Sequence, residues 1–235
     1  MTTVSATKPD LNAWIERLFA AEEMSQMGHG QRVEDLNLGM GFTYYALARM
    51  VRQQTAVVVG SYRGFVPLVL ARALSENVEG GHVIFIDPSL VDDFWADSES
   101  VDRHFHSYGQ DNIRHYRLTS QEFVKTETFR ALRDIGIVFV DSYHTEEQAE
   151  FEFRAFLPKL APEGFFIFHD SIRKRITRIY GPDKAYEHSV VCLMDRLKRD
   201  TAFQVMDLPF QDGATLVRQN LAVDPMSKTE GVVVG

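Results

Sequence analysis

Cysteine is almost absent from this sequence, because Cys192 is the only one among 235 residues. A single cysteine excludes an internal disulfide framework, a zinc ribbon and a Cys-x-x-Cys redox centre, and it fits a reducing compartment. The polar start MTTVSATKPD lacks the basic and apolar regions of a signal peptide. No apolar run approaches the roughly 18 residues of a membrane span. The sequence therefore predicts a cytoplasmic protein that does not bind membranes.

Positive charge is also scarce. The 25 lysines and arginines are outnumbered by 33 acidic residues, which gives a formal net charge of -8 and a pI near 5.5. Such a field repels phosphate backbones, so we expect no nucleic-acid partner. Hydrophobic residues, in contrast, make up 45% of the chain, and 17 residues are phenylalanine. This composition and length fit one large α/β domain with a substantial core.

Short apolar runs alternate with helical patterns along most of the chain. The expected strands cover residues 55–59, 82–86, 113–118, 135–140 and 165–168. Residues 203–208 and 215–218 then flank an Asp-Gly turn, which predicts a closing antiparallel hairpin. Alternation of this kind is typical of a doubly wound, mostly parallel sheet with helices on both faces. We therefore expect a seven-stranded α/β sheet.

The two ends of the chain differ from this pattern. Residues 1–38 are interpreted as a tail and helical cap, 39–220 as the main domain and 221–235 as a flexible tail. Within the cap, Trp14, Ile15 and Leu18 recur at helical spacing and predict an amphipathic helix. Its apolar face needs cover from the chain's own sheet or from a second copy, which leaves a homodimer open.

A glycine turn follows the first expected strand. It comprises Gly60, Ser61, Tyr62, Arg63 and Gly64. In a strand-turn-helix arrangement the backbone can approach a ligand closely, although such a turn is often only a tight connection. The second strand ends on Asp87, whose carboxylate can accept hydrogen bonds from both hydroxyls of a ribose. The turn is not the Gly-x-Gly-x-x-Gly fingerprint, which counts against a nicotinamide-dependent oxidoreductase.

Acidic and imidazole side chains end the fourth and fifth expected strands. Asp141 closes the fourth strand with His144 three residues later, and His169-Asp170 closes the fifth. Either aspartate, taken alone, is explained as a cap of the helix or turn that follows its strand. The joint pattern favours a site, because the carboxyl ends of parallel strands meet at the ligand-binding edge of a sheet. Two carboxylates can hold a divalent ion that lowers the pKa of a bound hydroxyl, and a neutral imidazole can take its proton.

Together these motifs resemble those of the class I S-adenosylmethionine (SAM) dependent methyltransferases. The resemblance covers roughly residues 39–218. The segment VVVGSYRGFVPLVLARAL is similar to the first motif of catechol-type O-methyltransferases and of the group that holds macrolide-sugar O-methyltransferases and cephalosporin hydroxylase proteins. VFVDSYH and FIFHDS resemble the metal-binding core of that second group. The resemblance implies a Rossmann-like fold and SAM-dependent O-methylation of a small molecule that carries a vicinal diol, either aromatic or sugar.

Residue by residue, the resemblance implies a cofactor site and a metal site. The implied cofactor-binding residues are Gly60, Ser61, Tyr62, Arg63, Gly64, Asp87, Ser89, Ser120, Gln121 and Asp141. Among them the glycine turn lines the methionine part, Asp87 holds the ribose, and Ser120 and Gln121 border the adenine. The implied ligands of Mg2+ or Mn2+ are Asp141, His169 and Asp170. His144 matches the general base, with Asp141 as the second catalytic residue.

Two positions depart from the family pattern. Val58 stands where many relatives have an acidic residue, and His169 stands where glutamate is common among the sugar methyltransferases. An imidazole ligand at His169 makes a transition ion more competitive, and the alternative is a hydrogen bond that orients Asp170. Other open interpretations are a metal-independent methyltransferase and a SAM-binding partner or scaffold protein. The basic residues Arg173, Lys174, Arg175 and Arg178 form either a solvated face or an attractor for an anionic acceptor.

Overall fold

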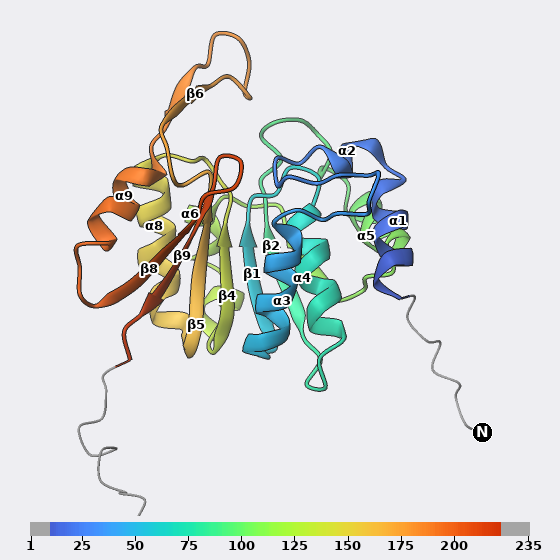
Figure 1. The fold of residues 1–235 in the computed structure, drawn as a ribbon, viewed down its shortest axis with the longest axis horizontal. Coiled ribbons are helices and arrows are strands. Elements are labelled where there is room, and N and C mark those ends of the chain that lie inside the picture. The colour runs from blue at the N-terminus through green and yellow to red at the C-terminus, as the bar shows by residue number, and fades with distance from the viewer. Residues whose placement is uncertain (1–9, 222–235) are drawn as a thin grey trace, which may run out of the picture.

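The computed structural model describes residues 10–221. Its main sheet has seven strands in the order β3-β2-β1-β4-β5-β9-β8 (Figure 1). The five parallel strands are β1 (Thr55–Val59), β2 (His82–Ile86), β3 (Ile113–Tyr116), β4 (Ile135–Val140) and β5 (Leu160–His169). The antiparallel strands are β8 (Phe203–Leu208) and β9 (Ala214–Gln219). The predicted doubly wound sheet and its closing hairpin are thus confirmed. The expected tails at residues 1–8 and 222–235 lie outside the described residues.

Helices cover both faces of the sheet (Figure 1). On one face lie α1 (Leu11–Phe19), α3 (Gly41–Val51), α4 (Phe65–Ser75) and α5 (Ser98–Ser107). On the other lie α6 (Ser120–Phe123), α7 (Glu127–Ala131), α8 (Glu146–Phe156) and α9 (Val190–Leu197). Neighbouring strand residues alternate between the two cores: Val58 belongs to the first and Val57 to the second. Burial on both faces explains why these strands are continuously apolar.

Helix α1 packs against its own chain. Asp10 caps the helix by accepting a hydrogen bond from the Ala13 amide at 2.9 Å. The side chains of Trp14, Ile15 and Leu18 are fully buried, and the Trp14 indole donates to the carbonyl of Tyr108 at 3.0 Å. The apolar face of this helix is therefore covered without a second copy, and the homodimer stays a prediction.

Removal of the Trp14 side chain tests how much this cap contributes to stability. We expect Trp14→Ala to lower the free energy of unfolding by about 3–5 kcal/mol, because truncating a large buried side chain leaves a cavity. Urea denaturation followed by circular dichroism measures the change. The matched control is Glu16→Ala, an exposed position of the same helix, with an expected change within about 0.5 kcal/mol. A loss below about 1 kcal/mol for Trp14→Ala would contradict the packing described.

Three sequence-based expectations need correction. The acidic composition of residues 88–103 indicates a loop, but α5 begins at Ser98, where Asp97 caps it and Val101 and Phe105 are buried. Trp95 is also buried. Strand β5 begins at Leu160 rather than at residue 165, directly after the 3-10 turn Leu157–Lys159 that ends α8.

The third correction concerns the segment after β5, whose basic residues are typical of a solvated loop. It contains a separate two-stranded sheet of β6 (Arg175–Thr177) and β7 (Tyr186–His188). This β6–β7 arm projects beyond the carboxyl ends of the main strands (Figure 1). Within residues 10–221, no helix combines the length and apolar character that a membrane crossing requires.

Candidate active site

A pocket of about 720 Å³ opens at the carboxyl ends of the parallel strands. The sequence-predicted residues that line it are Gly60, Ser61, Tyr62, Asp87, Ser89, Ser120, Gln121, Asp141, His144, His169 and Asp170. Arg63 and Gly64 are not among its lining residues. The Arg63 guanidinium instead pairs with Asp92 at 2.7 Å, and Gly64 precedes α4 beside the rings of Trp95 and Phe105.

The glycine turn packs tightly against the end of β4. Gly60 has a φ of 73°, and a Cβ at this position would lie 2.3 Å from the carbonyl oxygen of Asp141. The Gly60 amide donates to the carbonyl of Ile86 at 2.8 Å, and the Asp141 amide donates to the carbonyl of Val59 at 2.8 Å. Only glycine allows this approach. The turn and the Asp141 segment therefore form one rigid wall of the pocket.

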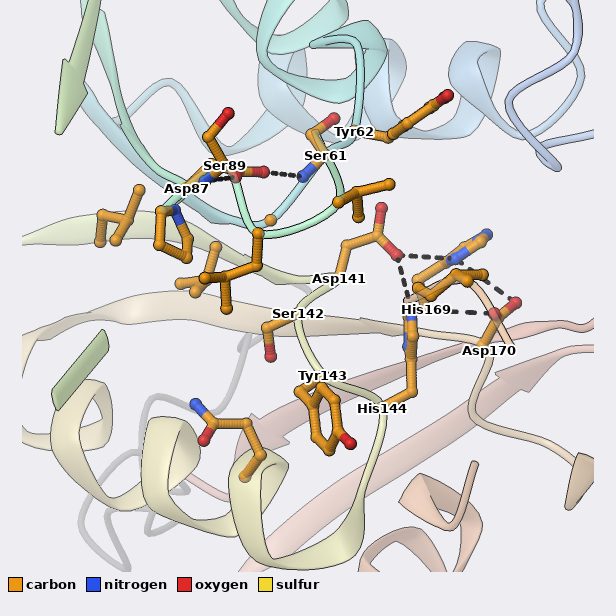
Figure 2. A pocket seen from close by; sticks show the side chains of 18 of the residues that line it. Ser61, Tyr62, Asp87, Ser89, Asp141, Ser142, Tyr143, His144, His169 and Asp170 are labelled. Carbon is orange, nitrogen blue, oxygen red and sulfur yellow. Dashed lines mark hydrogen bonds and ion pairs between the residues drawn. The ribbon is translucent and has the colours of Figure 1, made fainter. Parts of the chain in front are cut away.

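Asp87 faces the glycine turn from the end of β2 (Figure 2). Its carboxylate accepts hydrogen bonds from the Ser61 amide at 3.3 Å and the Ser89 amide at 2.8 Å. Burial raises the pKa of Asp87, although these two amides act in the opposite direction. Each carboxylate oxygen has a further lone pair. The residue is thus held in place with acceptor capacity left for the hydroxyls of a ligand, which fits a ribose.

A buried carboxylate lies behind the wall predicted to border the adenine. Glu152 on α8 is fully buried and accepts from the Ser120 hydroxyl at 2.5 Å, the Ser142 hydroxyl at 2.8 Å and the Gln148 amide at 2.6 Å. Burial raises the pKa of Glu152 to about 7. Sequence reasoning missed this residue. The available signal was an acid within the apolar stripe of the helix, between Ala149 and Phe153.

At the start of the same helix, Thr145 and Gln148 have the sequence spacing of a capping box. Thr145 caps α8 by accepting from the Gln148 amide. The side chain of Gln148 does not complete a capping box, however, because it donates to Ser120 and Glu152 instead.

Asp141, His144, His169 and Asp170 converge on the other side of the pocket (Figure 2). His169 Nδ1 lies 2.9 Å from Asp141 Oδ1 and 3.4 Å from Asp170 Oδ1. His144 Nε2 lies 3.6 Å from Asp141 Oδ1 and 3.9 Å from Asp170 Oδ2. Both ring nitrogens of His169 are buried, and the contacts of Nδ1 with the two carboxylates are ion-pair contacts.

Burial and charge set the protonation states in this cluster. Burial lowers the pKa of His144 to about 4, although Asp141 and Asp170 act to raise it. At His169 burial also favours the neutral ring, but the two carboxylates outweigh it and raise the pKa. Burial opposes ionisation of Asp170, yet His188, His169, His144 and Arg175 together lower its pKa. His144 is therefore a neutral imidazole beside an ionised carboxylate at pH 7.

The β6–β7 arm adds two residues that sequence reasoning missed as part of this cluster. His188 is buried, stacks on His144 with ring centroids 4.4 Å apart, and places Nδ1 3.4 Å from Asp170 Oδ2. Arg175 pairs with Asp170 and, at 2.8 Å, with Asp212. No sequence motif marks His188, because β7 is three residues long and mostly polar.

The donor atoms of this cluster are suited to a metal ion. Those of His144, Asp170 and His188 all lie within 4.8 Å of one another. The Nε2 atom of His188 is buried and has no hydrogen-bond partner among the described residues. Imidazoles beside a carboxylate suit transition ions better than Mg2+. Of the predicted ligands Asp141, His169 and Asp170, only Asp170 belongs to this group.

The basic cluster after β5 is largely neutralised by acids of the same chain. Arg173 pairs with Asp212, and Lys174 pairs with Glu187 at 2.8 Å. Arg175 contacts two aspartates, as described above. These three side chains are therefore less suited to attracting an anionic acceptor than the sequence indicates.

Four pocket residues have left-handed backbone conformations that side chains other than glycine rarely adopt. Their φ angles are 41° at Tyr62, 63° at Ser89, 31° at His144 and 50° at Asp170. Such conformations persist where the surrounding structure enforces them, and they gather at functional sites. The backbone thus supports the side-chain evidence for a site here.

Comparison with known proteins agrees with this geometry. Residues 57–171 match the model of the Methyltransf_24 family, described as a methyltransferase domain. A methyltransferase structure from Geobacter sulfurreducens is 19% identical, with 91% of each chain covered and a TM-score of 0.59. The O-methyltransferase TomG from Streptomyces achromogenes, in complex with SAM, is 15% identical over 93% of each chain, with a TM-score of 0.60.

An O-methyltransferase from Bacillus cereus, in complex with S-adenosylhomocysteine (SAH), is also 15% identical. The alignment covers 92% of this chain and 94% of that chain, with a TM-score of 0.59. No curated protein sequence matches the chain. At these identities the solved structures show only the fold of the chain. The family match indicates that residues 57–171 form a methyltransferase domain. Residues 57–171 therefore match a methyltransferase domain, in a chain that has the fold of the solved methyltransferases.

Proposed function

We propose that this chain is a SAM-dependent methyltransferase that methylates a hydroxyl oxygen of a small aromatic molecule. The observation that carries the proposal is the buried acid and imidazole cluster in the same pocket as the glycine turn and Asp87. Asp141 connects the two halves, because its backbone packs on Gly60 while its carboxylate contacts His169. SAM, when bound, supplies an already activated methyl group. The protein then has to align the acceptor and remove its proton.

His144 is the proposed general base. It lines the pocket and is neutral at pH 7, and the nearby carboxylates of Asp141 and Asp170 stabilise its protonated form. A pKa of about 4 makes this imidazole a weak base. A weak base favours an acidic hydroxyl, and a phenol with a pKa of about 10, as in tyrosine, is far more acidic than a sugar hydroxyl. This consideration supports an aromatic acceptor.

The β6–β7 arm supports the same choice. Ile179 and Tyr180 line the pocket from the turn between β6 and β7. Tyr143 stacks on Tyr186 and Tyr180, with ring centroids 4.3 Å and 5.4 Å away. Aromatic and aliphatic side chains of this kind suit a flat apolar ring, which can stack on them.

We further propose that a divalent cation binds between Asp170 and His188, whose donor atoms lie within 4.8 Å of each other. The His188 ring is buried, and its Nε2 atom has no hydrogen-bond partner among residues 10–221. A bound cation supplies a positive charge that lowers the pKa of a coordinated hydroxyl. Mn2+ or another transition ion suits these donors better than Mg2+. This arrangement leaves His144 free to accept the proton.

A combined binding and activity experiment tests these proposals. Metal-stripped protein is titrated with SAH and, separately, with Mn2+ and Mg2+ by calorimetry. Methyl transfer to 3,4-dihydroxybenzoate and to methyl glucoside is then measured with each ion. We expect SAH binding without metal, tighter binding of Mn2+ than of Mg2+, and methyl transfer to the catechol that requires the ion.

An Asp170→Ala variant provides the control for the metal. It should lose the metal-binding signal and retain SAH binding, because Asp170 lies on the side of the pocket away from Asp87 (Figure 2). Unchanged metal affinity in this variant would rule out the proposed ion site. Transfer to the glucoside in preference to the catechol would rule out the aromatic acceptor.

A further inference from the structure

Glu152 joins three pocket residues that come from separate parts of the chain. Ser120 begins α6, Ser142 follows β4, and Gln148 lies one helical turn before Glu152 on α8. All three line the pocket, whereas Glu152 is fully buried behind them. Each of the three donates a hydrogen bond to its carboxylate. Glu152 therefore contacts the wall of the pocket from behind.

This carboxylate is buried without a cationic partner among its hydrogen bonds. Burying a charge in that way is costly, and here it raises the pKa of Glu152 to about 7. A glutamine of the same size would avoid most of this cost. It would not impose the same polarity, however, because above pH 7 the carboxylate is mostly ionised and only accepts hydrogen bonds, whereas an amide both donates and accepts.

Because Glu152 accepts hydrogen bonds, it also sets which atoms donate and which accept at the pocket surface. Gln148 Nε2 donates to Glu152 and to Ser120, so the Gln148 carbonyl oxygen points the other way. That oxygen accepts from Gln121 Nε2 at 2.7 Å. The amide of Gln121 is thereby fixed in one of its two orientations, and its own oxygen is left as an acceptor for a donor outside the network.

We infer that Glu152 is a positioning residue that makes this end of the pocket selective for adenine. The inference rests on the placement of adenine beside Ser120 and Gln121. Adenine presents an amino group at position 6, which can donate to the Gln121 oxygen. Hypoxanthine presents a carbonyl there, which would meet the same oxygen and leave both acceptors unpaired. A site built to pair a polar group rejects an analogue that cannot form the pair.

The test compares the affinities of SAH and S-inosylhomocysteine, which differ at position 6 of the base. Calorimetric titration of the full chain should give a preference for SAH of about tenfold or more in the wild-type protein. We expect Glu152→Gln to reduce that preference at least about fivefold, because the Gln148 and Gln121 amides can then rotate. The KM for SAM should rise in this variant while kcat stays within about twofold, the pattern of lost cofactor binding.

Two further variants make the result decisive. Gln148→Met removes the hydrogen bonds that connect Glu152 to Gln121 through Gln148, but it leaves the Ser120 and Ser142 bonds to Glu152. It should therefore reduce the preference for SAH as Glu152→Gln does. Glu147→Gln changes an exposed glutamate of the same helix and should leave the preference unchanged. An unaltered preference in both Glu152→Gln and Gln148→Met would overturn the inference. So would a wild-type protein that binds the two nucleosides equally.

These titrations need neither a methyl acceptor nor a metal ion. Failure of the proposed hydroxyl methylation would therefore leave the selectivity result intact. Conversely, loss of the predicted selectivity would not affect the assignment of His144.

Discussion

An alanine in place of His144 is expected to lower turnover by roughly a hundredfold or more, the usual scale for a lost general base. Affinity for SAH should change little, because His144 lies with Asp170 and His188 rather than with Asp87. Turnover is measured under saturating SAM with the acceptor identified in the screen above, and SAH affinity by calorimetry. The matched control is His106→Ala, an exposed histidine of α5.

The Mn2+ affinity of the His144→Ala variant distinguishes a general base from a metal ligand at this position. The imidazole cannot accept a proton while its nitrogen binds an ion, and His144 belongs to the group of donors within 4.8 Å of one another. If His144 is the base, His144→Ala keeps its Mn2+ affinity while turnover falls. Loss of both would make it a ligand, and wild-type turnover would exclude it from the chemistry altogether.

Gly60→Ala is expected to have the largest effect on the cofactor. The added methyl group would lie 2.3 Å from the carbonyl oxygen of Asp141, so the turn or the end of β4 must move. The left-handed conformation itself costs about 1–2 kcal/mol for an alanine. We expect SAH affinity to fall by at least about tenfold, which corresponds to 1.4 kcal/mol, and the thermal unfolding midpoint to fall as well.

Gly80→Ala is the matched control for this substitution. Gly80 has a φ of 66°, close to that of Gly60, but a Cβ there would meet nothing within 4 Å. This variant therefore has the backbone cost without the collision, and Gly80 does not line the pocket. It should lose some stability and keep its SAH affinity. Equal SAH affinities in the two variants would mean that the Gly60 contact with Asp141 does not shape the cofactor site.

Sequence reasoning succeeded where a residue's local pattern and its final environment agree. The runs at 55–59, 82–86 and 135–140 coincide with β1, β2 and β4, because strands buried on both faces must be apolar at every position. The polar residues that follow the parallel strands β2, β4 and β5 then reach the pocket by topology alone. For this reason Asp87, Asp141 and Asp170 all line it, as expected.

The missed features depend on contacts distant in sequence or on atypical composition. Helix α5 carries its buried Val101 and Phe105 among charged residues and histidines, which resemble a loop. His188 reaches Asp170 only because the β6–β7 arm folds back, and no local pattern predicts a three-residue strand. Glu152 gave a signal, an acid on an apolar stripe, but its three partners become visible only in the folded chain.

The β6–β7 arm has a consequence for how this enzyme could diversify. Its base is tied to the acid and imidazole cluster of the pocket through Arg175 and His188, which contact Asp170. The turn at its tip carries Ile179 and Tyr180 into the pocket and belongs to no strand of the main sheet. We therefore expect gene duplicates to acquire new acceptors through changes in residues 178–185 and to keep the proposed cofactor wall around Gly60 and Asp141.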